Sequence, residues 1–110
     1  MKWRKFNGVE ITRPIEDEVR ETIEKEAAAG NKLKVCIGSD SQVYGKTIEF
    51  GTVIVFLREG RGGFMLIANE SSTQRMSLKE RLLYEVSRAI EIAYALCNLL
   101  VEHGVDMEPH

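Results

Sequence analysis

The sequence predicts an α/β protein in an α+β arrangement: a three-stranded antiparallel meander and the start of a fourth strand, packed by one long helix. Three observations predict this class. Residues 47–57 are rich in β-branched and aromatic side chains, glycine-containing turns separate the apolar runs, and residues 77–103 follow a helical period. An N-terminal hairpin and helix come first. With 110 residues, 44% of them hydrophobic, residues 1–110 fit a single domain.

The N-terminal segment predicts a hairpin followed by a helix. Asn7-Gly8 lies between apolar residues and is typical of a type I′ turn, which needs two positive φ angles. Thr12 and Pro14 indicate a helix start, acidic residues crowd the first turn, and Gly30 ends the helix. The apolar stripe of this helix repeats every four residues and consists of Ile15, Val19, Ile23 and Ala27.

Three strands are predicted in succession. Residues 33–38 form a flat apolar run that suits a central place in a sheet. Residues 47–57 form the second strand, and the glycines of residues 60–63 predict a turn before a third strand at 64–68. One face of the second strand is expected to hold Ile48, Phe50, Thr52, Ile54 and Phe56.

The longest predicted helix runs from Ser77 to His103, and Gly104 ends it. Ser77 and Glu80 have the spacing of a capping box, in which each side chain satisfies a backbone donor of the first turn. Residues from 105 onward begin a fourth strand. The stripe expected to pack on the sheet consists of Leu82, Leu83, Val86, Ala89, Ile90, Ala93, Leu96, Cys97, Leu100 and Val101.

Composition narrows the class of protein. No segment approaches the roughly 18 uninterrupted apolar residues of a membrane span, so we expect a cytoplasmic protein that does not contact a membrane. Cys36 and Cys97 lie in apolar patterns and are predicted to be buried. The net charge of −2 argues against strong nonspecific binding to nucleic acid, although residues 31–81 carry eight basic and five acidic side chains.

Asp40 is the first candidate for chemistry, because it follows the apolar run of residues 34–38 at the place where that strand is expected to end. A carboxylate held rigidly by a buried strand suits a divalent cation or a reacting water. The alternative is structural. Acidic residues after strands often accept hydrogen bonds from nearby backbone groups.

The stretch Ile-Gly-Ser-Asp-Ser-Gln at residues 37–42, the strand at 47–57, the Gly-Arg-Gly-Gly-Phe segment at 60–64 and the helix at 78–93 resemble the YkuK family of ribonuclease H-like domains. The resemblance implies a ribonuclease H-like fold and cleavage of nucleic-acid phosphodiesters. It also implies two divalent cations, Mg²⁺ or Mn²⁺, held by carboxylates, where one ion activates water and the other stabilises the leaving oxygen. Asp40 matches the first ligand.

The second ligand implied by the resemblance lies on the long helix, where Glu80 and Glu85 are both candidates. Glu85 borders the apolar stripe, whereas Glu80 points farther away and has the capping role, so Glu85 is preferred as catalytic and metal-binding residue beside Asp40. Pairing of Glu85 with Arg81 or Arg88 is the structural alternative. The predicted substrate contacts are Ser39, Ser41, Gln42 and Arg75.

The resemblance also implies further carboxylates in a region beyond residue 110, so the domain is expected to be incomplete at its C-terminal end. Two carboxylates alone hold Mg²⁺ weakly, because the ion keeps most of its waters. A second hypothesis is therefore a catalytically inactive ribonuclease H-like scaffold or binding module. Such a module would pair with a partner, or form a homo-oligomer through an unpaired fourth strand.

Overall fold

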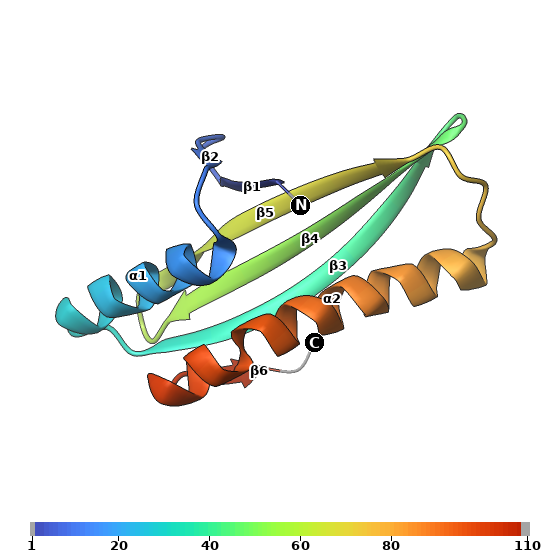
Figure 1. Ribbon diagram of the computed structural model, residues 1–110. Coiled ribbons are helices and arrows are strands. Elements are labelled where there is room, and N and C mark those ends of the chain that lie inside the picture. The colour runs from blue at the N-terminus through green and yellow to red at the C-terminus, as the bar shows by residue number, and fades with distance from the viewer. Residues whose placement is uncertain (1, 109–110) are drawn as a thin grey trace.

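The computed structural model describes residues 2–108, and within them six strands form one mixed sheet in the order β2-β1-β5-β4-β3-β6. Both helices cover the same face of this sheet (Figure 1). The arrangement confirms the predicted fold class. The elements are β1 (Lys2–Lys5), β2 (Glu10–Ile11), α1 (Ile15–Ala28), β3 (Leu33–Tyr44), β4 (Thr47–Arg58), β5 (Gly62–Ser72), α2 (Leu78–Glu102) and β6 (Asp106–Glu108).

The three central strands form the predicted antiparallel meander. A two-residue loop, in which Gly45 has a positive φ of 58°, joins β3 to β4, and a three-residue loop joins β4 to β5. The expected alternation on β4 is confirmed, because Ile48, Phe50, Thr52, Ile54 and Phe56 are all buried. The fourth strand is confirmed as β6, which pairs in parallel with residues 34–36 of β3.

The strand boundaries of β3 and β5 were predicted too short. The apolar run of β3 stops at Gly38, but the strand continues to Tyr44 because each of its residues has a partner on β4. Pairing across a sheet supports polar residues that no apolar pattern would assign to a strand. Asp40 therefore lies inside β3, opposite Gly51, and does not end the strand as expected.

The N-terminal hairpin of β1 and β2 is present, but its turn differs from the predicted type I′. Among the described residues only glycines have positive φ, so Asn7 does not supply the first of the two positive angles. The N–H of Lys5 donates to the carbonyl of Val9 at 2.8 Å, and Gly8 has φ of 92°. The loop is thus the three-residue type, in which a glycine forms a bulge after the turn.

A single hydrophobic core lies between the sheet and the two helices. It consists of Trp3, Val19, Ile23, Leu33, Val35, Ile37, Ile54, Phe56, Leu66, Ala68, Ile92, Leu96, Leu99 and Leu100. Helix α1 contributes the middle of its predicted stripe. Neither helix of the described chain combines the length and apolarity needed to cross a membrane.

The predicted stripe of α2 is wrong in six of its ten members. The helix packs on the sheet through Ile92, Leu96, Leu99 and Leu100, while the other large apolar side chains of the stripe are 49–73% exposed and Cys97 is exposed as well. At about 100° per residue the apolar arc of α2 is wider than a sheet can cover, so one edge of the arc is buried and the other faces outward. The exposed members are Leu82, Leu83, Val86, Ile90 and Val101.

Candidate functional site

Ser41 forms hydrogen bonds with Asp40 and Glu85, the two residues that the sequence analysis preferred as metal ligands. Its side chain faces the helices and is 8% exposed. Its hydroxyl donates to Oε2 of Glu85 at 2.5 Å and accepts from Nε of Arg81 at 3.2 Å. Its backbone N–H donates to Oδ1 of Asp40 at 2.8 Å, and its carbonyl accepts from Nη2 of Arg81 at 3.4 Å.

The position of Ser41 explains these bonds. Among the described residues, β6 pairs with β3 only at residues 34–36, so β3 is an edge strand where it passes Ser41. The N–H and C=O of one strand residue point to the same side, and both of these groups find side-chain partners. Asp40 and Arg81 therefore block the open edge at this point. The alternative role of Asp40, acceptance of a nearby backbone hydrogen bond, is present in the structure.

Asp40 and Glu85 approach Ser41 from opposite faces of the sheet, because successive strand residues point to opposite faces. Asp40 is exposed on the face without helices, in a hollow that it shares with Gln42, Glu49 and Asn69. Glu85 lines a different hollow on the helix side. The two carboxylates therefore line different hollows and are linked through Ser41, and their sharing of one ion stays a prediction.

The donor set does not fit a two-ion centre. Within the described residues, no three side chains of the His, Cys, Asp or Glu types gather closely enough to hold a metal ion. One carboxylate oxygen of Asp40 (Oδ1) and one of Glu85 (Oε2) accept hydrogen bonds from Ser41. The guanidinium of Arg81 also lies against Ser41, where its positive charge would oppose a cation.

Glu80 has the capping role anticipated from its spacing. The N–H of Ser77 donates to Oε1 of Glu80 at 3.0 Å, and the N–H of Glu80 donates to Oγ of Ser77 at 3.2 Å. The backbone bond from Ser77 is the main reason why the pKa of the Glu80 carboxyl lies below its usual value. Its side chain is exposed at the start of α2 and does not contact Ser41.

The four predicted substrate contacts are distributed over different surfaces. Ser39 and Ser41 face α2, whereas Gln42 lies on the opposite face and accepts a hydrogen bond from the hydroxyl of Tyr44. Arg75 is exposed in the loop between β5 and α2. These residues do not surround one common hollow.

A polar cluster that sequence reasoning missed holds the first half of α2 against β4 and β5. The hydroxyl of Tyr84 donates to Glu70 at 2.9 Å, and Arg88 contacts both the Tyr84 hydroxyl at 2.6 Å and the Glu70 carboxylate at 3.3 Å. The Tyr84 ring lies 4.3 Å from that of Phe50. The four-residue spacing of Tyr84 and Arg88 was visible in the sequence, but their partner on β5 was not.

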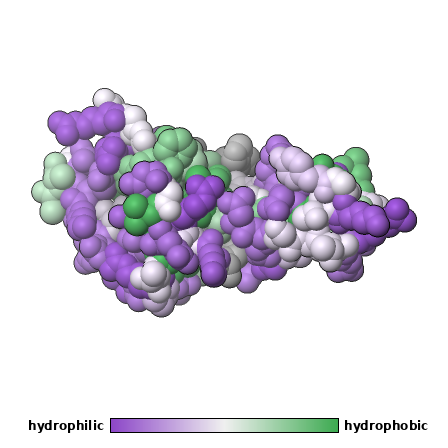
Figure 2. Space-filling model, turned by 90° about the horizontal axis from the view of Figure 1, so that it is seen from above, coloured by the Kyte–Doolittle hydropathy of each residue, from purple (hydrophilic) through white to green (hydrophobic). Residues whose placement is uncertain are grey.

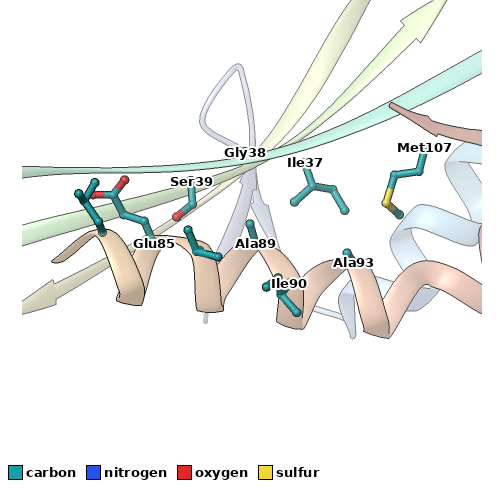
Figure 3. A pocket seen from close by; sticks show the side chains of 10 residues that line it. Ile37, Gly38, Ser39, Glu85, Ala89, Ile90, Ala93 and Met107 are labelled. Atoms are coloured by element: carbon teal, nitrogen blue, oxygen red, sulfur yellow. The ribbon is translucent and has the colours of Figure 1, made fainter. Parts of the chain in front are cut away.

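An apolar groove runs along the exposed side of α2. Its first part, a hollow of about 580 Å³, lies between α2 and the β3 edge, with Ser39 and Glu85 toward one end and Ile37 and Met107 toward the other (Figure 3). The Oγ of Ser39 is buried there without a hydrogen-bond partner in the described chain. A second hollow of about 630 Å³ continues along α2 and shares Ile90, Ala93 and Met107 with the first.

Comparison with known protein families shows the family to which this chain belongs. The model of the ribonuclease H-like family matches residues 15–110, which include every element from α1 to β6. The chain belongs to the ribonuclease H-like family. This finding confirms the resemblance read from residues 37–42 and from the pattern of strands and helix that follows. No curated protein and no solved structure matches this ribonuclease H-like chain.

Proposed function

We propose that this ribonuclease H-like chain is a protein-binding module that recognises another polypeptide through the exposed side of α2. The observation that carries the proposal is a row of large apolar side chains, each at least 49% exposed. We call this row the apolar α2 face, and it consists of Leu78, Leu82, Leu83, Val86, Ile90, Tyr94 and Val101.

The extent of the apolar α2 face supports binding. Scattered apolar residues are normal on a protein surface, whereas a contiguous apolar patch of several hundred Å² is typical of an interaction site. On the side of the molecule seen in Figure 2, hydrophilic residues predominate and apolar ones form separate small groups. Along α2, in contrast, the apolar residues follow one another at each turn and adjoin the groove beside β3.

Cleavage of nucleic-acid phosphodiesters with Mg²⁺ or Mn²⁺ is the competing function. It is favoured by family membership and by the link that Ser41 makes between Asp40 and Glu85. It requires the carboxylates of Asp40 and Glu85, which lie on opposite faces of the sheet, to turn toward one another around the strand edge. Arg81 would also have to withdraw, since its guanidinium contacts the same hydroxyl.

A metal titration separates the two functions. Backbone amide resonances of residues 38–42 and 85 are followed by NMR while Mg²⁺, and separately Mn²⁺, is added to millimolar concentration, and labelled RNA and DNA are incubated under the same conditions. We expect no saturable shift and no cleavage. A saturable response at Asp40 and Glu85 that is lost in Asp40→Asn, or metal-dependent cleavage, would refute the binding-module proposal.

The binding surface is tested with a neutral apolar dye. Nile red should fluoresce with the dilute chain, and Ile90→Glu should reduce this fluorescence severalfold, because the substitution places a charge in the middle of the apolar α2 face. Asn98→Glu is the matched control, since it adds the same charge on an exposed part of α2 outside that face. Equal fluorescence of the two variants would contradict the assignment of the surface.

A further inference from the structure

The exposed side of α2 has the spacing of a helix–helix seam. Leu83, Val86, Ile90, Ala93 and Cys97 are separated alternately by three and four residues. This spacing keeps one row of apolar side chains on one side of a helix and is the pattern by which two helices pack along their lengths. The sheet uses little of the row, because α2 packs on it through Ile92, Leu96, Leu99 and Leu100, and of the row Ala93 alone is partly buried against the core. The occupant that fits this row is another helix.

The charges near the two ends of the row favour a second helix that runs antiparallel to α2. Residues 75–81 carry three basic side chains and one acidic one, and Lys79 lies on the same side of α2 as the row, one turn before Leu82 and Leu83. Glu85, which lines the groove at this end, accepts a hydrogen bond from Ser41. The other end of the groove is lined by the exposed Asp106, and the last turn of α2 contains no basic residue. Two such surfaces in antiparallel order bring the basic end of one beside the acidic end of the other, whereas a parallel order would bring like charges together.

We infer that the apolar α2 face binds a second copy of this chain, in an antiparallel pair of α2 helices with its two-fold axis beside Ile90. The two Ile90 side chains then meet at the axis, and Leu83 of each copy faces Cys97 of the other. One self-complementary surface serves both copies, as in other two-fold dimers. The inference rests on the proposed function and names the partner that the same surface recognises.

The size of the surface suits a weak to moderate dimer. Seven large side chains at exposures from 49% to 80% present several hundred Å² on each copy. Specific interfaces bury about 800 Å² per partner, and smaller ones are generally transient. We therefore expect a monomer–dimer equilibrium with a dissociation constant on the order of micromolar, so that dimers form at ordinary laboratory concentrations.

Sedimentation equilibrium over a concentration series tests the dimer. The unsubstituted chain should dimerise, and Ile90→Glu should weaken association by at least about tenfold because two like charges would be buried at the axis. Asn98→Glu should retain the affinity of the unsubstituted chain. Circular dichroism and thermal melting of both variants verify the fold, which neither substitution should disturb, since Ile90 is 49% exposed and Asn98 is exposed.

A disulfide tests the antiparallel order. Leu83→Cys, in a chain whose Cys36 is replaced by serine, should form a covalent dimer through Cys97 of the second copy under mild oxidation, because the two positions face one another across the axis. The same chain without Leu83→Cys should stay monomeric on a non-reducing gel. Leu83 is 60% exposed, so its replacement does not disturb the core.

Three results would overturn the inference: a monomer at every concentration up to about 200 μM, a dimer that Ile90→Glu leaves unchanged, or cross-linking between the two Cys97 residues with none to position 83. These failures are distinguishable from failure of the proposed function. A monomer whose Nile red fluorescence still depends on Ile90 would keep the binding surface and lose only the second copy. A saturable metal response would instead remove the proposed function itself.

Discussion

Ser41→Ala should lower the free energy of unfolding by about 1–3 kcal/mol. The substitution removes the hydroxyl that donates to Glu85 at 2.5 Å and accepts from Arg81 at 3.2 Å. A hydrogen bond to a charged group contributes about 1.5–3 kcal/mol, and Ser41 is only 8% exposed. Direct pairing of Arg81 with Glu85, four residues apart on α2, would return about 0.3–0.5 kcal/mol. Together these values give the expected loss.

Urea unfolding at neutral pH measures this loss as a decrease of about 0.5–3 M in the transition midpoint, for a slope of about 1–2 kcal/mol/M. A double-mutant cycle with Glu85→Gln isolates the pair, and its coupling energy should exceed about 0.5 kcal/mol. Asp40→Ala is the companion variant. It removes only the acceptor of the Ser41 N–H and should cost about 1 kcal/mol. A change below about 0.3 kcal/mol in Ser41→Ala, with zero coupling, would show that Ser41 does not hold α2 to β3.

Four further substitutions test the fold. Gly63→Ala should cost about 1–3 kcal/mol in urea unfolding, because its new Cβ would lie 2.4 Å from a backbone carbonyl oxygen of β4, whereas Gly51→Ala, with its nearest atom at 3.7 Å, should be almost neutral. Ser77→Ala should cost about 1 kcal/mol through loss of the helix cap, and full helical stability in that variant would contradict the cap. Glu26 accepts a hydrogen bond from Arg58 at 2.6 Å, and this contact lowers the pKa of the Glu26 carboxyl below its usual value of 4.5. The contribution of the contact to the free energy of unfolding is therefore present above pH 4.5 and is lost as the pH falls through the lowered pKa. Glu26→Gln should therefore destabilise at about pH 7 by about 1 kcal/mol and progressively less as the pH falls through the lowered pKa; a loss that does not change with pH would refute the ion pair.

Local patterns were enough to find most elements. The β-branched run of β4, the capping box of Ser77 and Glu80, and the ends of both helices at Gly30 and Gly104 depend on residues close together in the chain. Local chemistry therefore specified them before any packing was known. The same reasoning stopped β3 at Gly38, because the residues beyond it form a strand only through their partners on β4.

The candidate site could be predicted only as a set of residues. Asp40, Ser41 and Glu85 were singled out from the sequence, and Ser41 does contact the other two. Which face of β3 each side chain occupies depends on the strand continuing through residue 40, and a strand that ended there would have left Asp40 free to turn toward α2. Arg81 was considered only as a partner of Glu85, and its contact with the strand edge needed the packing of α2.

The sequence by itself determined the order of strands and helices, the caps and the apolar character of α2, since propensity, turn chemistry and periodicity act over a few neighbouring residues. Only the tertiary structure decided which edge of the apolar arc of α2 is buried, and hence that Leu82, Val86 and Ile90 face outward. The physical reason is geometric. Helical periodicity determines the width of the apolar arc of α2, but not how the helix is rotated about its own axis against the sheet. The contacts that fix this rotation, Ser41 with Glu85 and Glu70 with Tyr84, join residues far apart in the chain.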